Sequence, residues 1–175
     1  MPDDRPVDPT QRVFVSYIDK SREYYLAQGF GNPYRWAHFD EVPFTPLARR
    51  LAECTVGLIT TSEMVIRGRE ADLAEIENDP TCPVYSLPMD TPPTLLYSRK
   101  ASYDRYATTL DDVDAYLPLT HLRRFAAEGR IAGLAPRFQL VHSQYSQRRT
   151  LSVDAPRVLA ELREARVDVA VLTAV

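Results

Sequence analysis

The stretch Thr45-Pro-Leu-Ala-Arg-Arg-Leu-Ala-Glu-Cys-Thr-Val-Gly-Leu-Ile-Thr-Thr61 indicates the fold class. Thr45 is a good N-cap, and Pro46 suits the first helical position, where a missing N–H costs nothing. The stretch therefore predicts a short helix that leads into residues 56–59, the apolar run most like a buried central strand. Open α/β sheets commonly begin in this way, and their chemistry lies beyond the carboxyl ends of the strands.

Outward from this stretch, apolar periodicity and turn residues predict alternating helices and strands. We expect helices over 17–28, 70–78 and 117–128 and from 152 or 154 onward, and strands over 94–98, 137–142 and 167–173. Gly29 and Gly129 follow two of these helices as C′ residues. Residues 79–93 carry five prolines and predict an irregular connection.

This alternation predicts an α/β fold, a three-layer Rossmann-like, mostly parallel sheet of about four strands with flanking helices. Residues 1–12 are rich in Pro and Asp and predict a flexible tail, followed by a single domain over 13–175. The chain ends on an apolar strand with no helix after it. We expect either an earlier helix or another protein chain to cover that strand.

Composition narrows the function classes. The 175 residues carry a net charge of −3, and the basic residues are scattered, which argues against a nucleic-acid or polybasic membrane surface. No apolar run reaches the roughly 18 residues of a membrane span, and no signal-peptide pattern is present, so we expect a cytoplasmic protein. Cys54 and Cys82 form no metal-ligand or CxxC pattern and are expected to be free thiols. The three histidines lack the spacing of a zinc site, so no metal is expected.

Several candidate site residues follow expected strand ends. Thr61 leaves the first strand, Asp104 lies in the loop after residues 94–98, and His142 ends the strand over 137–142. Asp104 and His142 are candidates to move protons. The alternative is that these short polar groups form turn and capping hydrogen bonds.

Two other clusters carry charge. Arg35 and His38 can present a guanidinium and an imidazole to an anionic substrate, or can lie in an aromatic segment that packs over the sheet edge. Asp112, within Asp111-Asp112-Val-Asp114, can bind a hard cation or cap the following helix. Cys54 precedes the first strand, at the end of the sheet opposite the expected site, which favours a buried, inert thiol.

The run Tyr34-Arg-Trp-Ala-His-Phe-Asp-Glu-Val-Pro-Phe-Thr-Pro-Leu-Ala, continuing to Leu-Ala-Glu-Cys54-Thr-Val-Gly-Leu-Ile-Thr-Thr61, resembles the opening of the glycine/sarcosine/betaine/D-proline reductase selenoprotein B family. Weaker similarities are Phe125-Ala-Ala-Glu-Gly-Arg-Ile-Ala-Gly-Leu-Ala-Pro136 and Val167-Asp-Val-Ala-Val-Leu-Thr-Ala-Val175. The resemblance implies a Rossmann-like fold and reductive cleavage of an activated amine, with electrons from thiols.

Departures from the family pattern concern the redox residue and one loop. The family's selenocysteine or cysteine segment has no counterpart here. In the loop that resembles Ser-His-Asp-His-Tyr, Ser102, Asp104 and Tyr106 carry over, but both histidines do not. The resemblance therefore implies that any redox thiol or selenol comes from a partner chain or an external thiol.

We accordingly expect an oxidoreductase-like protein that acts on a small amine or amino-acid-type substrate. Its catalytic residues would be Asp104, Asp112 and His142, and the substrate would be bound by Arg35, His38, Thr61 and Tyr106. No particular cofactor is indicated. The expected partners are the substrate and another protein chain, in a homo- or hetero-oligomer, but neither nucleic acid nor membrane. The alternatives are a non-catalytic binding or scaffold subunit and a metal-assisted lyase or hydrolase.

Overall fold

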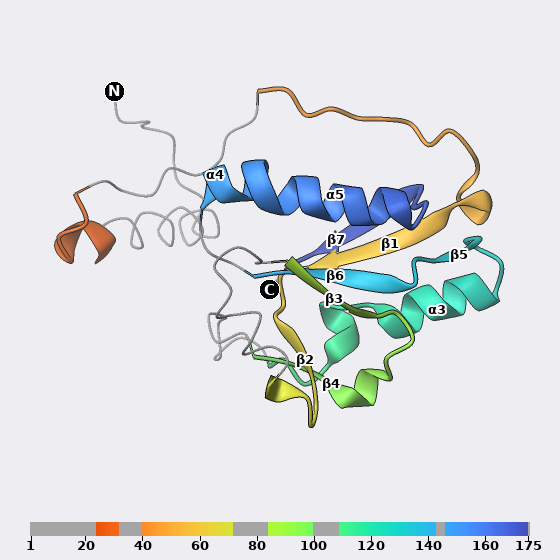
Figure 1. Ribbon diagram of the computed structural model, residues 1–175, viewed down its shortest axis with the longest axis horizontal. Coiled ribbons are helices and arrows are strands. Elements are labelled where there is room, and N and C mark those ends of the chain that lie inside the picture. Colours follow the sequence, from red (N-terminus) through yellow and green to blue (C-terminus); the bar gives the residue numbers. More distant parts are fainter. Residues whose placement is uncertain (1–23, 32–39, 72–83, 100–108, 143–145, 175) are drawn as a thin grey trace, which may run out of the picture. The chain divides into compact units, whose positions relative to one another are not determined.

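The structure is a computed structural model that describes residues 24–31, 40–71, 84–99, 109–142 and 146–174 (Figure 1). The chain divides into two compact units, Met1–Pro43 and Phe44–Val175. The predicted boundary between a tail and a domain at residue 12 lies outside the described residues. Each unit is considered by itself below.

In the first unit, residues 24–31 include the end of a helix. Residues 24–27 are helical, and Gly29 follows with a φ of 85°, a left-handed conformation that glycine adopts without strain. The Phe30 N–H donates to the Tyr25 carbonyl, and the Gly29 N–H donates to the Leu26 carbonyl. This pattern is the Schellman motif. It confirms Gly29 as the C′ residue, whereas the start of the predicted helix lies outside the described residues.

The second unit is built on a five-stranded sheet with β1 at its centre. β7 pairs in parallel along one edge of β1, and β5 and then β6 pair in parallel along the other edge. β3 lies outside β6 and is antiparallel to it. The strands are β1 (Thr55–Thr60), β3 (Val84–Pro88), β5 (Gly133–Leu134), β6 (Arg137–Val141) and β7 (Val169–Thr173). The prediction of a mostly parallel sheet is confirmed.

Helices cover both faces of β1 (Figure 1). Val56 and Leu58 belong to the larger core, together with Leu119 and Leu122 of α3 (Leu119–Ala127). The opposite face of β1 presents Ile59, which packs in a smaller core. That smaller core is closed by Val158 and Leu162 of α5 (Ala155–Glu164). A strand buried on both faces explains why residues 56–59 are continuously apolar.

Two helices of the second unit correspond to predicted helices. α3 is the predicted helix over 117–128, and Gly129 follows it with a φ of 69°. The Arg130 N–H reaches the Phe125 carbonyl, again in a Schellman arrangement. The last helix begins earlier than predicted, with α4 (Gln147–Arg149) and the π-helical turn η4 (Thr150–Asp154) leading into α5.

The predicted helix from Thr45 is wrong. Residues 44–50 form no regular structure, and only the 3-10 turn η1 (Leu51–Glu53) precedes β1. Leu47 and Leu51, the expected inner face, are 47% and 48% exposed. A helix this short is marginal in water unless an apolar face is buried, and this one has no core to bury its leucines.

The region between β1 and α3 also differs from the prediction. Residues 93–95 form the 3-10 turn η2 (Pro93–Leu95), and β4 (Leu96–Ser98) pairs antiparallel with β2 (Met64–Ile66) in a separate two-stranded sheet. Within the expected irregular connection lies β3, which ends on Pro88. A proline is tolerated there because β3 is the outer strand of the sheet. Of the predicted helix over 70–78, only residues 70–71 are described, and they are helical.

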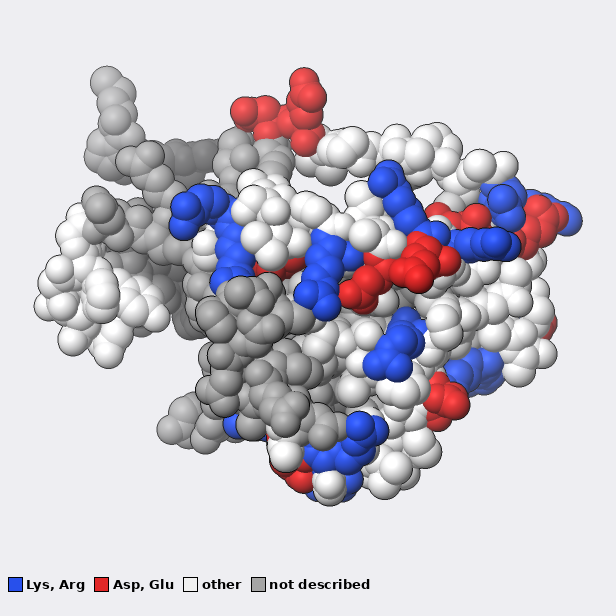
Figure 2. All heavy atoms as spheres, viewed as in Figure 1, with Lys and Arg blue, Asp and Glu red and all other residues white. Residues whose placement is uncertain are grey.

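The final strand is covered on one side only. Val169 and Val171 pack against the larger core, whereas Leu172 is 73% exposed. On the face of the molecule over α5, basic and acidic side chains are interspersed (Figure 2), as in the ion pair between Arg157 and Glu161. In the described parts of the chain, no helix is long and apolar enough to cross a membrane.

Candidate functional site at the carboxyl edge of the sheet

Three parallel strands end together at one edge of the main sheet. β1 ends at Thr60, β6 ends one residue before His142, and β7 ends at Thr173. Thr60 is in register with Leu140 of β6 and with Thr173 of β7. This is the edge at which open α/β sheets place their chemistry. It brings Thr61 and His142, two of the predicted site residues, to the same end of the sheet.

The hydroxyl groups of Thr60 and Ser62, at the end of β1, make hydrogen bonds within the turn there. Thr60 Oγ1 and Ser62 Oγ are 2.8 Å apart, and both residues are fully buried. The Ser62 N–H also donates to Thr60 Oγ1 at 3.2 Å, and the Ser98 hydroxyl donates to the Ser62 carbonyl. The Thr61 N–H donates to the Thr173 carbonyl at 3.2 Å. Thr60 and Ser62 therefore make the local turn hydrogen bonds that were the alternative to a role in the site.

Glu63 and His142 form the chemically most suggestive pair at this edge. His142 Nδ1 lies 3.4 Å from Glu63 Oε1, with the side chains 31% and 15% exposed. A neutral imidazole with its proton on Nδ1 points that proton at the carboxylate and leaves a lone pair on Nε2. A carboxylate in this position orients the ring and stabilises the imidazolium that forms when Nε2 takes a proton.

The backbone of Glu63 explains how the carboxylate reaches the histidine. Its φ is 50°, in the left-handed region that residues other than glycine rarely adopt. The Arg99 N–H donates to the Glu63 carbonyl at 3.2 Å and ties this turn to the end of β4. A strained non-glycine residue costs of order 1–3 kcal/mol, and such residues cluster at functional sites. The sequence analysis did not single out Glu63, although it directly follows Thr60-Thr61-Ser62.

A second acidic group is buried in the turn that leads into α5. Asp154 ends the π-helical turn η4 and is 4% exposed. Arg149 Nε lies 3.8 Å from Asp154 Oδ1. Burial raises the pKa of the Asp154 carboxyl above its usual value, and the positive charge of Arg149 acts in the opposite direction. From sequence, Asp154 was considered only as a possible start of the helix.

The other predicted site residues are placed differently. Asp112 precedes the 3-10 turn η3 (Val113–Ala115), and its Oδ1 accepts from the Asp114 N–H at 3.2 Å. Asp114 Oδ1 in turn accepts from the Thr120 N–H at 2.8 Å in the first turn of α3. These two carboxylates therefore make the capping contacts that were the alternative to cation binding. Four predicted residues lie outside the described residues: Arg35, His38, Asp104 and Tyr106.

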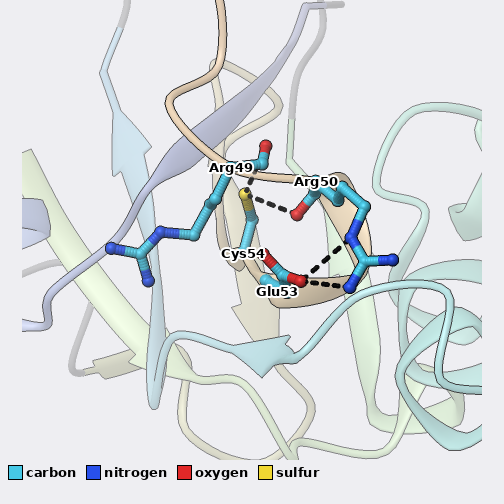
Figure 3. Close-up of polar contacts among 4 residues, drawn as sticks. All are labelled: Arg49, Arg50, Glu53 and Cys54. Atoms are coloured by element: carbon cyan, nitrogen blue, oxygen red, sulfur yellow. Dashed lines mark hydrogen bonds and ion pairs between the residues drawn. The ribbon is translucent and has the colours of Figure 1, made fainter.

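Cys54 lies at the opposite end of β1 from His142. It is fully buried, and its thiol donates weakly to the backbone carbonyls of Arg50 at 3.4 Å and Arg49 at 3.9 Å (Figure 3). The Arg50 guanidinium pairs with Glu53 rather than with the sulfur. The predicted burial of Cys54 is confirmed, and its thiol does not lie at the carboxyl edge. Cys82 lies outside the described residues.

In the described parts of the chain, no group of three or more His, Cys, Asp or Glu side chains is arranged to hold a metal ion. Comparisons with protein-family models, with curated proteins and with solved structures find no match to this chain.

Proposed function

We propose that this chain is an oxidoreductase-like protein similar to the glycine/sarcosine/betaine/D-proline reductase selenoprotein B family, and that it acts on a small amine or amino-acid-type substrate. The observation that carries the proposal is the Glu63/His142 pair at the carboxyl edge of a mostly parallel sheet. In this reading, His142 Nε2 takes the proton of the attacking thiol and then gives it to the amine after that amine has left, and Glu63 holds the imidazole in place. The proposal includes a Rossmann-like three-layer arrangement for the domain, for which the packing of α3 and α5 on opposite faces of β1 is the support.

The electrons must come from a second thiol source. Reductive cleavage breaks the C–N bond of R–NH₃⁺ and oxidises a dithiol to a disulfide, giving R–H and NH₄⁺, so that atoms and charge balance. Cys54 is unsuited to this step because it is buried at the other end of β1. We therefore propose that the dithiol, or a selenol with a thiol, is supplied by another protein chain or by an external thiol.

The test is turnover by the full chain. Dithiothreitol supplies the dithiol. The substrates are glycine, sarcosine, betaine and D-proline, and the assay measures the amine released and the thiol consumed. We expect amine release with at least one substrate, and His142→Asn should lower kcat by about 10²–10⁴-fold, the usual contribution of a general acid or base. Glu63→Gln should lower kcat less, because the ring loses the carboxylate that orients it.

The control is His121→Asn, which removes an exposed imidazole from α3 and should leave the rate unchanged. Equal rates for wild type and His142→Asn would refute a proton-transfer role for His142.

The burial of Cys54 at the opposite end of β1 also favours a second candidate, a non-catalytic binding subunit of a heteromeric enzyme. That protein would release no amine with dithiothreitol alone but would co-purify with a thiol- or selenol-bearing chain. Amine release that needs no partner would exclude it.

A further inference from the structure

The position of Asp154 along the sheet follows from the packing of α5. A Cβ added at Gly57 would lie 2.8 Å from Leu162 Cδ2, so Leu162 lies over Gly57. Asp154 precedes Leu162 by eight residues, or about 12 Å along the helix axis. Between three and four residues of a strand span the same length. Because α5 runs from the end of β6 back to the start of β7, this displacement points toward the carboxyl edge. Asp154 therefore lies level with the exit of β1.

Thr61 lies on the same face of the sheet as Asp154. Gly57 and Ile59 face α5, and side chains alternate along a strand. Thr61 continues the ladder of β1 through its bond to the Thr173 carbonyl, so it is the next residue on that face. Asp154 shares a helix stripe with Val158 and Leu162, the two residues that pack onto this face. The carboxylate of Asp154 thus lies on the same face of the sheet as the predicted substrate-binding residue Thr61, displaced from Leu162 toward the carboxyl edge.

The hydrogen bonding of Asp154 is incomplete. Among the described residues, its Oδ1 is buried and accepts no hydrogen bond, and Arg149 Nε at 3.8 Å is beyond hydrogen-bond distance. Leaving a buried charged acceptor without a donor costs more than about 1–3 kcal/mol, so native proteins rarely do so without a functional reason. The π-helical turn that carries Asp154, closed by the Ala155 N–H to the Thr150 carbonyl, belongs to a class of turns frequent at functional sites.

We propose that Asp154 Oδ1 accepts a hydrogen bond from the ammonium group of the substrate at the carboxyl edge of the sheet. The inference rests on the proposed function and specifies its substrate class: a primary or secondary amine that carries an N–H when it is charged. An ammonium group supplies the missing donor and a positive charge. A charge-assisted hydrogen bond of this kind contributes about 1.5–3 kcal/mol. Asp154 binds the amine in this role, whereas the Glu63/His142 pair moves the proton.

The experiment is calorimetric titration of the full chain with glycine, sarcosine, betaine and acetate. Asp154→Asn keeps the shape of the side chain and removes its charge, so we expect it to weaken glycine and sarcosine by about 10–100-fold. Acetate, which has no ammonium group, should bind wild type and Asp154→Asn alike. The matched control is Asp111→Asn, an exposed acidic residue before η3, and it should change neither affinity.

Equal affinity of wild type and Asp154→Asn for glycine would overturn the inference. An equal loss of affinity for glycine and acetate would also overturn it, because it would indicate a structural role. A second comparison uses the wild-type protein alone, so it does not depend on the folding of a variant. Betaine lacks an N–H, so it should bind at least 10-fold more weakly than glycine. Equal binding of betaine and glycine would count against Asp154 as an acceptor. A wild-type chain that binds neither glycine nor sarcosine refutes the inference as well.

The two proposals fail separately. The inference is judged by binding at Asp154, and the proposed function by the loss of turnover in His142→Asn. Unchanged glycine affinity in Asp154→Asn together with lost turnover in His142→Asn would refute the first and leave the second in place.

Discussion

Gly57 is where α5 comes closest to the central strand. A Cβ at this position would lie 2.8 Å from Leu162 Cδ2 and 3.1 Å from Val167 Cγ1. Both neighbouring side chains pack in the smaller core, so neither has free space into which to move. A glycine inside a strand often marks such a close approach. At this residue, the absence of a side chain lets α5 lie directly on β1.

Gly57→Ala should therefore destabilise the protein by about 1–3 kcal/mol, the usual cost of overpacking a core. The free energy of unfolding from urea titration measures the effect. Gly133→Ala is the control, because a Cβ at Gly133 meets nothing within 4 Å although it also lies in a strand of the same sheet. Similar losses for the two variants would show that the approach of Leu162 to Gly57 does not limit the size of this residue.

At the scale of elements, α3 begins through side chains from the preceding turn rather than through its own first residue. Its N-cap is Pro118, whose side chain makes no capping bond, and the Thr120 N–H is instead satisfied by Asp114 Oδ1. Asp112 Oδ1 accepts from the Asp114 N–H and fixes the turn that positions Asp114. The acidic cluster thus has a structural role in starting α3.

Asp114→Ala should cost about 1 kcal/mol of stability, as the loss of a helix cap usually does. Asp111→Ala should be neutral to within about 0.5 kcal/mol, since Asp111 is exposed and makes no side-chain contact in the described residues. Thermal unfolding followed by circular dichroism at 222 nm compares the two. A stable Asp114→Ala protein would show that water replaces the cap without loss.

At the scale of the whole molecule, the buried apolar clusters that the described residues form lie in one of the two units. Both clusters of buried apolar residues lie within Phe44–Val175. β7, the last element, pairs with β1 through five residues of register and contributes Val169 and Val171 to the larger core. The second unit thus holds the interactions that a cooperative fold requires, including those of its terminal strand.

A chain that starts at Phe44 should therefore unfold in a single cooperative urea transition. The control is a chain that starts at Phe44 and ends at Asp168. It lacks β7 and should lose the cooperative transition, because the central strand then has one edge unpaired and part of the larger core exposed. A noncooperative transition in the chain that keeps β7 would show that residues before Phe44 are needed for folding.

By itself, the sequence determined the elements whose signals are local. The strand at residues 56–59, the strand at 137–142, the strand at 167–173 and the helix ended by Gly129 were all recognisable, because apolar periodicity and glycine C′ positions depend on neighbours within a few residues. The mostly parallel sheet followed from their alternation. The burial of Cys54 was also predictable, because its place before the first strand assigns it to the amino end of the sheet.

Only the tertiary structure decided which chemical groups meet. Glu63 reaches His142 because a left-handed turn after β1 brings two residues distant in sequence to one edge. The position of Asp154 along β1 follows from the register of α5, which is set by the contact of Leu162 with Gly57. The helix expected from Thr45 was lost for the converse reason, since no surface buries its apolar face. Such contacts depend on long-range packing, and a local sequence pattern does not predict which distant residue a side chain will contact.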